Sequence, residues 1–402
     1  MMEDNVFGIA KLDGDLNGIP DGKVVIFAAS PSVGNEVFGY QVIYSNIIRN
    51  KKVLLLLNRA SPLAYINDMK DYDFIANNNL TILDAYSNFT LITPEKTDNI
   101  KVIQNPSNKD ELLNTLLAEM SNGYDILVID SLSIFVDTFG FDFVKSLIEK
   151  ISASQNRKIS STLMFTEWNY DQKDLDSIYS KANATIQIRG IEKRVIFGQY
   201  FAVIKCDWVK NNEFSSALFK VLRPGGIKLY IPKILVTGPT NAGKSSFIHS
   251  SCKNAVSVDR LGGTIALDHG TLDFEGYIAD MFGTPGQERF DPLLKMLGGE
   301  AIGVILVVDA TDDKGFPRAI EMLRKTETYG LPIVVVANKY DLKGALKIDE
   351  IKEKLHLGES VPIVPTVAED LSKVDPNEPT KLKDEGIHQA LSILFSLLKV
   401  KV

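Results

Sequence analysis

Residues 238–245 have the residue types and spacing of a phosphate-binding loop, G-x-x-x-x-G-K-[ST]. The loop follows an apolar run, residues 234–237, that predicts a β-strand, and it precedes a stretch that predicts a helix. In such a loop, backbone N–H groups and the helix N-terminus surround phosphate oxygens. Lys244 would neutralise the β and γ phosphates, and the Ser245 hydroxyl would bind Mg²⁺. The residues predicted to contact the nucleotide here are Gly238, Asn241, Ala242, Gly243, Lys244, Ser245 and Ser246.

A second motif, Asn338-Lys339-Tyr340-Asp341, directly follows the predicted strand at residues 333–337. Guanine can donate N1–H and N2–H hydrogen bonds to the carboxylate of Asp341. Adenine has no hydrogen on N1 and no amino group at C2, so it would leave that carboxylate unpaired, and such mismatches are strongly rejected. The motif therefore predicts GTP and GDP as ligands, with Asn338, Lys339 and Asp341 as base-binding residues.

Two segments between these motifs resemble the switch regions of known proteins. Residues 282–290, Phe-Gly-Thr-Pro-Gly-Gln-Glu-Arg-Phe, resemble the third motif of small Ras-like GTPases, which reads D-T-A-G-Q-E-R-F in many members. Residues 263–270 resemble their switch I region. Together the two segments are most similar to prokaryotic Ras/Arf-related GTPases. The resemblance implies a Ras-like domain that hydrolyses GTP with the help of Mg²⁺. We expect hydrolysis to be slow, because no arginine finger is assignable within the chain.

The resemblance also implies a role for each matched residue. Gly286 takes the place of the glycine that senses the γ-phosphate, and Gln287 that of the glutamine that orients the attacking water. Thr264 corresponds to the switch threonine that meets Mg²⁺. The expected catalytic residues are then Gln287, Lys244 and Thr264, and the expected metal ligands are Ser245 and Thr264.

The sequence departs from the Ras-like pattern at several positions. Gly283 stands where most Ras-like proteins carry the aspartate that holds Mg²⁺ through water, so either the affinity for Mg²⁺ is lower or Asp280 or Asp268 compensates. Thr240 replaces a small loop glycine and would crowd an arginine supplied by a partner. The motif behind the guanine is poorly preserved. Spacing places Ala368 there, with its N–H toward the guanine carbonyl, and an ordinary strand end and loop is an equal alternative.

The N-terminal half resembles RecA-like ATPases of the KaiC type over about residues 7–230. The resemblance rests on residues 7–22 and on the predicted strand at residues 24–28. A phosphate loop should follow, but Asn35 stands at its lysine position and Glu36 at its serine or threonine position. A carboxylate there would repel a polyphosphate. We therefore expect that this half does not bind ATP in the usual way.

Other positions of the N-terminal half support the same expectation. Asn58 and Arg59 stand where KaiC-type proteins carry a catalytic glutamate pair, although Asp130 remains at the end of a second predicted strand. The half would then retain a RecA-like fold without its chemistry. Because such domains often form rings or filaments, self-association into a homo-oligomer is a hypothesis that rests on this resemblance.

Short apolar runs alternate with amphipathic helical stretches through both halves, which predicts parallel sheets covered by helices. The turn at residues 224–226 is the best boundary. We expect an α/β protein with two P-loop-type three-layer α/β/α domains, a RecA-like domain at residues 1–230 and a Ras-like GTPase domain at residues 231–402. The predicted strands are residues 24–28, 53–57, 126–129 and 162–165, a more antiparallel set at 184–188, 200–205 and 217–222, and then 234–237, 276–282, 304–308, 333–337 and 361–365.

The composition limits the remaining options. The chain has 402 residues, a formal net charge of −7 and 45% hydrophobic residues, so it has no basic excess for nucleic acid. The histidines and the two cysteines lack metal-binding spacing. No apolar run reaches about 18 residues, and the chain has no signal-peptide or lipidation motif. We therefore expect a soluble cytoplasmic protein with no direct membrane anchor.

The favoured hypothesis is a GTP/GDP switch that acts on effector or regulator proteins of unknown identity. One alternative is a GTP-binding scaffold with negligible hydrolysis, which the missing carboxylate at Gly283 favours. Another is an ATP-driven RecA-like motor or kinase with an accessory GTPase, which Asn35 and Glu36 argue against.

Overall fold

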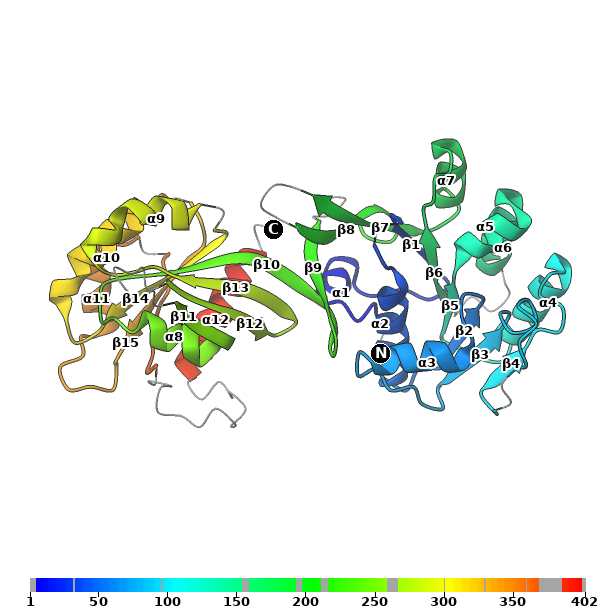
Figure 1. The fold of residues 1–402 in the computed structure, drawn as a ribbon, viewed down its shortest axis with the longest axis horizontal. Helices are drawn as coiled ribbons and strands as arrows, with labels where there is room; N and C mark the ends of the chain where they lie inside the picture. Colours follow the sequence, from blue (N-terminus) through cyan, green and yellow to red (C-terminus); the bar gives the residue numbers. More distant parts are fainter. Residues whose placement is uncertain are drawn as a thin grey trace. The chain divides into compact units, whose positions relative to one another are not determined.

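Figure 1 shows the computed structural model of the chain, which describes residues 5–31, 33–94, 97–153, 159–192, 197–210, 216–258, 267–299, 301–328, 330–358, 360–368 and 385–399. The chain divides into two compact units, unit 1 (Met1–Leu229) and unit 2 (Tyr230–Val402). Each unit has a sheet with a parallel core and helices on both faces, as the alternating pattern predicts.

Unit 1 contains a sheet with the strand order β4-β3-β2-β5-β6-β1-β7-β8-β9. Neighbours from β4 to β7 are parallel, whereas β7, β8 and β9 pair antiparallel. The helices are α1 (Ala10–Leu16), α2 (Glu36–Ile47), α3 (Pro62–Lys70), α4 (Lys109–Met120), α5 (Leu132–Phe139), α6 (Phe141–Ser152) and α7 (Gln172–Tyr179). The strands are β1 (Val24–Ala29), β2 (Val53–Leu57), β3 (Leu80–Asp84), β4 (Ile100–Val102), β5 (Ile126–Asp130), β6 (Ser160–Thr166), β7 (Ala184–Glu192), β8 (Phe197–Cys206) and β9 (Ala217–Leu222).

The central strand β1 shows how the layers of unit 1 arise. Val24, Ile26 and Ala28 point to one face and join the apolar core formed with α4, α5, α6 and α7. Phe27 points to the other face, where its ring packs against Phe38 of α2. Because both faces are covered, every residue of β1 is buried, as expected for a strand inside a parallel sheet.

Unit 2 contains a sheet with the strand order β11-β12-β13-β10-β14-β15-β16, in which β10, β14, β15 and β16 are parallel. Its strands are β10 (Gly226–Thr237), β11 (Lys253–Val258), β12 (Leu267–Phe274), β13 (Tyr277–Gly283), β14 (Gly303–Asp309), β15 (Ile333–Asn338) and β16 (Ile363–Pro365). Its helices are α8 (Lys244–Ser251), η1 (Glu288–Phe290), α9 (Asp291–Gly298), η2 (Asp313–Gly315), α10 (Phe316–Lys325), α11 (Ile348–Leu355) and α12 (Glu385–Lys399). The boundary between the units falls within β10, whose first residues pair with β9 and whose last residues pair with β14.

Alternation along β14 places helices on both faces of the sheet of unit 2. Leu306 and Val308 pack against α10 and α11. Gly303 faces the opposite side, where a Cβ at this position would lie 3.2 Å from Leu394 of α12. Helix α8 packs against β11, β12 and β13. The phosphate-loop helix therefore covers the part of the sheet that contains the antiparallel strands.

The structure contains a strand at each predicted position, together with strands that the sequence did not predict, including β11 and β12. In β12 the buried face carries Asp268 and Gly270 before Leu272 and Phe274. A polar residue and a glycine on the buried face hide the alternation of apolar and polar residues that predicts a strand.

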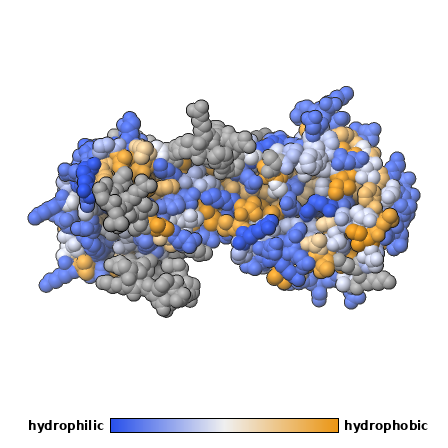
Figure 2. Space-filling model, in the orientation of Figure 1, coloured by the Kyte–Doolittle hydropathy of each residue, from blue (hydrophilic) through white to orange (hydrophobic). Residues whose placement is uncertain are grey.

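The surface seen in Figure 2 mixes hydrophilic and apolar residues. Among the described residues, the most exposed large apolar side chains include Leu91, at 92%, and Met296, at 68%. Singly exposed apolar residues are common on folded proteins. In the described part of the chain, no helix combines the length and the hydrophobicity needed to cross a bilayer.

Candidate functional site

The predicted phosphate loop joins the end of β10 to the start of α8 and depends on two glycines. Gly238 has φ +145°, and a Cβ there would lie 2.0 Å from the carbonyl oxygen of Val307. Gly243 has φ +97° and is the N-cap of α8. Asn241 also has a positive φ, of 62°. This backbone turns sharply between strand and helix, as a concave phosphate-binding loop must.

Lys244 is a buried cation at the first position of α8. Only 8% of the residue is exposed, and its Nζ donates a hydrogen bond of 2.7 Å to the carbonyl oxygen of Pro239 in the same loop. Burial lowers the pKa of Lys244 to about 8, an effect that the Asp268 carboxylate opposes and the Arg318 charge reinforces. A buried ammonium group beside a helix N-terminus is well placed to gain from a bound polyphosphate.

Ser245 is linked to strand β12 rather than to β13. Its Oγ donates a hydrogen bond of 2.6 Å to Oδ2 of Asp268, and Asp268 is only 8% exposed. Gly283, at the end of β13, lies close to the same carboxylate, since a Cβ there would be 3.3 Å from Asp268 Oδ2. Ser246 follows as a half-buried residue of α8.

Asp280 lies on the opposite face of the sheet from the phosphate loop. It alternates along β13 with the buried residues Ala279 and Met281. Its carboxylate accepts hydrogen bonds from Tyr230 Oη at 2.7 Å and from Thr271 Oγ1 at 3.0 Å. Of the two aspartates considered from the sequence, only Asp268 therefore lies beside Ser245.

Asn338 connects the phosphate loop with the two loops predicted to hold the base. Its Nδ2 donates to the carbonyl oxygen of Ala242 at 3.0 Å, and its Oδ1 accepts from the backbone N–H of Ala368 at 2.9 Å. A Cβ on Gly243 would lie 2.0 Å from Asn338 Nδ2, so glycine is required there. The N–H of Ala368, predicted to point toward the guanine carbonyl, therefore donates to the side chain of Asn338 in this structure.

The remaining residues of the base motif differ in exposure. Lys339 has φ +59° and its Nζ forms an ion pair with Asp309 at the end of β14. Asp341 is exposed. Because β14 and β15 are parallel neighbours, Asp309 and Lys339 meet at the same edge of the sheet as the phosphate loop. The structure thus brings the predicted phosphate and base motifs to one edge.

Gly286 and Gln287 lie next to the phosphate loop. A Cβ on Gly286 would lie 2.5 Å from the backbone nitrogen of Thr240, so only glycine fits at this close approach. Gln287 follows as an exposed residue at the start of η1. Thr284 Oγ1 donates to Thr237 Oγ1 at 2.9 Å, which joins this segment to the strand that leads into the loop. Thr264, the other predicted catalytic residue, lies outside the described residues.

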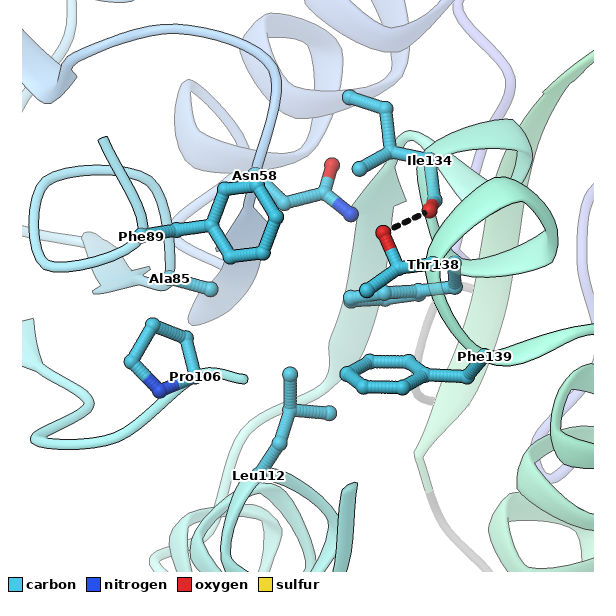
Figure 3. Close-up of a pocket in the computed structure, with 9 residues that line it drawn as sticks. Asn58, Ala85, Phe89, Pro106, Leu112, Ile134, Thr138 and Phe139 are labelled. Carbon is cyan, nitrogen blue, oxygen red and sulfur yellow. Dashed lines mark hydrogen bonds between the residues drawn. The ribbon is translucent and has the colours of Figure 1, made fainter. Parts of the chain in front are cut away.

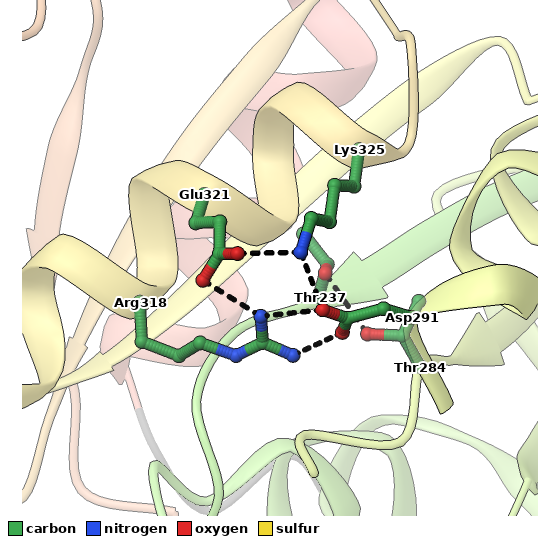
Figure 4. A network of polar contacts seen from close by, with 6 residues as sticks. All are labelled: Thr237, Thr284, Asp291, Arg318, Glu321 and Lys325. Atoms are coloured by element: carbon green, nitrogen blue, oxygen red, sulfur yellow. Dashed lines mark hydrogen bonds and ion pairs between the residues drawn. The ribbon is translucent and has the colours of Figure 1, made fainter. Parts of the chain in front are cut away.

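A network of charges holds the helix that follows Gln287 (Figure 4). Both terminal nitrogens of Arg318 donate to the carboxylate of Asp291, the first residue of α9. Lys325 contacts both Asp291 and Glu321. The hydrogen bonds from Arg318 and Lys325 lower the pKa of Asp291 to about 2. The spacing of the charges on α10 is visible in the sequence, whereas their contact with Asp291 is not.

The corresponding loop of unit 1 carries a negative rather than a positive side chain. Glu36 is the first residue of α2, and a Cβ on Gly34 would lie 2.8 Å from its Oε1. The carboxylate is therefore beside the loop. Asn35, at the lysine position, is 7% exposed.

Unit 1 has a cation at the end of strand β2, Arg59, and this cation is paired with a carboxylate of the protein itself. Arg59, which follows β2, donates to both carboxylate oxygens of Asp130 at the end of β5, from Nε to Oδ1 at 3.2 Å and to Oδ2 at 3.3 Å, and from a terminal nitrogen to Oδ2 at 3.2 Å. The same guanidinium donates to Tyr40 Oη at 3.0 Å. Asp130 is completely buried, and burial raises its pKa while Arg59 opposes that shift. The arginine thus neutralises an aspartate of the protein itself.

An apolar crevice lies at the carboxyl ends of β2 and β3 in unit 1 (Figure 3). None of its lining residues is charged, and Thr138 donates to the carbonyl oxygen of Ile134 at 2.7 Å. Asn58 exchanges two hydrogen bonds with the backbone of Ser131. The crevice therefore has no cation for a phosphate group. Its lining residues are Asn58, Ala85, Phe89, Pro106, Leu112, Ile134, Phe135, Thr138 and Phe139.

Sequence comparisons match the C-terminal part of the chain. The model of the ADP-ribosylation factor family matches residues 227–397. ADP-ribosylation factor-related protein 1 of Homo sapiens is 33% identical over 129 residues, which cover 30% of this chain and 64% of that protein. ADP-ribosylation factor-like protein 2 of Drosophila melanogaster is 30% identical over 129 residues, which cover 31% of this chain and 69% of that protein.

Solved structures similar to the chain include two archaeal proteins. A KaiC-like protein from Pyrococcus horikoshii OT3 has 16% sequence identity and a TM-score of 0.43, and the match covers 56% of this chain and 97% of that one. The flagellar accessory protein FlaH from Methanocaldococcus jannaschii has 15% identity and a TM-score of 0.42, with 54% and 94% covered.

Proposed function

The chain belongs to the ADP-ribosylation factor family through unit 2, and we propose that it is a GTP/GDP switch that hydrolyses GTP slowly. We assign this activity to a GTPase domain at residues 231–402. The observation that carries the proposal is the position of Asn338, which joins the loop of the buried Lys244 to the base motif. A phosphate-binding cation and a base-recognition loop held together by one side chain fit a guanine nucleotide.

The donor set of the site fits a nucleotide-bound Mg²⁺ ion. Among the described residues, no group of three or more His, Cys, Asp or Glu side chains could hold a metal by itself. The hydroxyl of Ser245 lies at the helix N-terminus beside the Asp268 carboxylate, and Mg²⁺ prefers oxygen ligands shared with phosphates. We propose Ser245 and Thr264 as protein ligands. The bound ion would neutralise charge that develops on the phosphate oxygens.

The side chains of unit 2 have distinct tasks in the proposed hydrolysis. Lys244 stays charged beside the β and γ phosphates, and the loop N–H groups orient them. Gln287 is exposed and follows the glycine that packs on Thr240, so a small movement of the segment would bring its amide to the attacking water. The ion pairs of Asp291 hold the following helix, which limits the range of positions open to Gln287.

We propose that unit 1 does not hydrolyse a nucleotide and serves as a scaffold or regulator of unit 2. The support is chemical, because Glu36 places a carboxylate at the loop and Arg59 is occupied by the buried Asp130. The resemblance to KaiC-type proteins further suggests self-association through unit 1. A monomer mass in light scattering, with and without GTP, would contradict self-association.

A GTP-binding scaffold with negligible hydrolysis is the second candidate. The observation that favours it is the absence of a carboxylate at Gly283 together with the exposure of Gln287. Single-turnover hydrolysis of GTP with and without Mg²⁺ separates the two candidates, since a scaffold would release no phosphate above the rate in solution.

The proposed switch is tested by Gln287→Leu. The variant should bind GTP as the wild-type chain does, and its turnover should fall at least about tenfold because the attacking water loses its orientation. GTP binding is measured by calorimetry and turnover by phosphate release. Glu288→Gln, at the neighbouring exposed position, is the matched control and should change neither quantity. Unchanged turnover in Gln287→Leu would remove this residue from the mechanism.

A further inference from the structure

We propose that Asp268 supplies to the Mg²⁺ of the nucleotide the carboxylate that position 283 lacks. The inference rests on the proposed function of unit 2 and deepens it. The acidic group would then come from strand β12, one strand away from the position where the Ras-like pattern carries it.

The pairing of β12 with β13 places the two positions together. His269 pairs with Phe282, so Asp268 and Gly283 are the next residues of the antiparallel pair. Both residues are buried, whereas His269 and Phe282 are half-buried and their rings contact each other. Because side chains alternate along strands, Asp268 and Gly283 belong to the face that α8 covers.

Steric contacts show that the side chains of Asp268 and Ile248 crowd position 283. A Cβ on Gly283 would lie 2.9 Å from Cδ1 of Ile248 and 3.0 Å from Cβ of Asp268. Contacts this short require a neighbour to shift. Both contacted atoms belong to buried, packed side chains, Ile248 and Asp268. Asp268 therefore already occupies space next to residue 283, which fits the presence of a glycine at that position.

The hydrogen bond with Ser245 gives Asp268 its role toward the metal. The serine hydroxyl donates a hydrogen bond to Asp268 Oδ2 at 2.6 Å, which leaves the lone pairs of Oγ for a cation. An outer carboxylate that accepts from a metal ligand orients that ligand and adds negative charge near the ion. Asp280 does not compete for this role, because its carboxylate is bound to Tyr230 and Thr271 on the other face of the sheet.

The test compares two isosteric substitutions, Asp268→Asn and Asp280→Asn, in the full chain. GDP is bound in EDTA, the chelator is removed by gel filtration, and Mn²⁺ is then titrated and followed by the electron paramagnetic resonance signal of the free ion. Asp268→Asn should weaken Mn²⁺ binding to the GDP complex by about tenfold or more, the usual effect of removing an outer carboxylate. Asp280→Asn should leave the titration unchanged. GDP binding in EDTA should be retained by both variants.

A position swap provides the second test. Gly283→Asp alone should destabilise the chain, because its side chain meets Asp268. Combining Gly283→Asp with Asp268→Gly should recover the stability lost to the contact with Asp268, and tight Mn²⁺ binding. If Asp268→Asn does not fold, the swap still decides the matter, since a folded swap that binds Mn²⁺ as the wild type does supports the shared position.

The outcomes distinguish this inference from the proposed function. Tight Mn²⁺ binding by the GDP complex of Asp268→Asn would overturn the inference alone, as would a folded swap with weak Mn²⁺ binding. Failure of the wild-type chain to bind GDP, with and without the metal, would overturn the proposed function and the inference together.

Discussion

The two units share the order strand, loop and helix at the phosphate-loop position, but their helices begin with side chains of opposite charge. In each unit a buried parallel strand leads through a short loop into a helix, β1 into α2 and β10 into α8. The helix begins with Glu36 in unit 1 and with Lys244 in unit 2. The difference teaches that a strand, a loop and a helix N-terminus do not by themselves make a phosphate site, because the side chain at the first helical position sets the sign of the local field.

The two units also use their internal ion pairs differently. In unit 1 the guanidinium of Arg59 is held by the buried carboxylate of Asp130. In unit 2 the ammonium of Lys244 donates a hydrogen bond to the carbonyl oxygen of Pro239, and burial lowers its pKa to about 8. A cation that is held by a carboxylate gains little from a new anion, whereas a desolvated cation without such a partner at hydrogen-bond distance gains more.

The comparison predicts that one nucleotide binds per chain and that it depends on Lys244. Lys244→Ala should weaken GDP binding by about thirtyfold or more, because truncating one partner of a buried charge contact costs about 2–5 kcal/mol. Calorimetry with GDP and ATP gives both affinity and stoichiometry. Lys343→Ala, at an exposed lysine of unit 2, is the control and should bind as the wild type does. Binding of ATP that survives Lys244→Ala would show that unit 1 also holds a nucleotide.

The ion pair of unit 1 should contribute to stability and not to nucleotide binding. Arg59→Ala leaves Asp130 buried without its cation, and we expect the free energy of unfolding of unit 1 to fall by about 2 kcal/mol. Removing one partner of a fully buried ion pair costs about 3–5 kcal/mol. We expect a smaller loss here because a third of the Arg59 side chain is exposed. Urea unfolding followed by tryptophan fluorescence reports on unit 1 alone, since the two tryptophans, Trp168 and Trp208, lie in it.

A double variant controls for the loss of packing by the arginine side chain. Arg59→Ala combined with Asp130→Asn should recover part of the stability, because no buried charge is then left unpaired. An Arg59→Ala chain as stable as the wild type would mean that the pair is not what holds the ends of β2 and β5 together.

The lowered pKa of Lys244 predicts a pH dependence of nucleotide binding. Bound phosphates favour the charged lysine, so binding above neutral pH requires uptake of a proton. With a pKa of about 8 in the free protein, affinity for GDP should fall about fourfold between pH 7 and pH 8.5. Calorimetry at pH 8 in two buffers of different ionisation enthalpy measures the uptake directly. If GDP binding at pH 8 takes up no proton, Lys244 is already fully charged in the free protein.

The sequence allowed the local parts of the site to be predicted. The loop at residues 238–245, the strand before it and the base motif are short stretches whose patterns depend on neighbouring residues alone. The parallel arrangement of unit 1 could also be predicted, because its strands are continuous apolar runs such as residues 53–57. Strand β12 was missed because Asp268 and Gly270 occupy its buried face.

The sequence by itself determined which groups are available: a lysine and a serine on the phosphate loop of unit 2, an asparagine and a glutamate at the same positions of unit 1, and a glycine where a carboxylate was expected. Only the tertiary structure decided their partners. Ser245 meets Asp268 across 23 positions, and Arg59 meets Asp130 across 71. Such pairs form because strand order and register bring distant strand ends to one edge of a sheet, and no local pattern encodes that register.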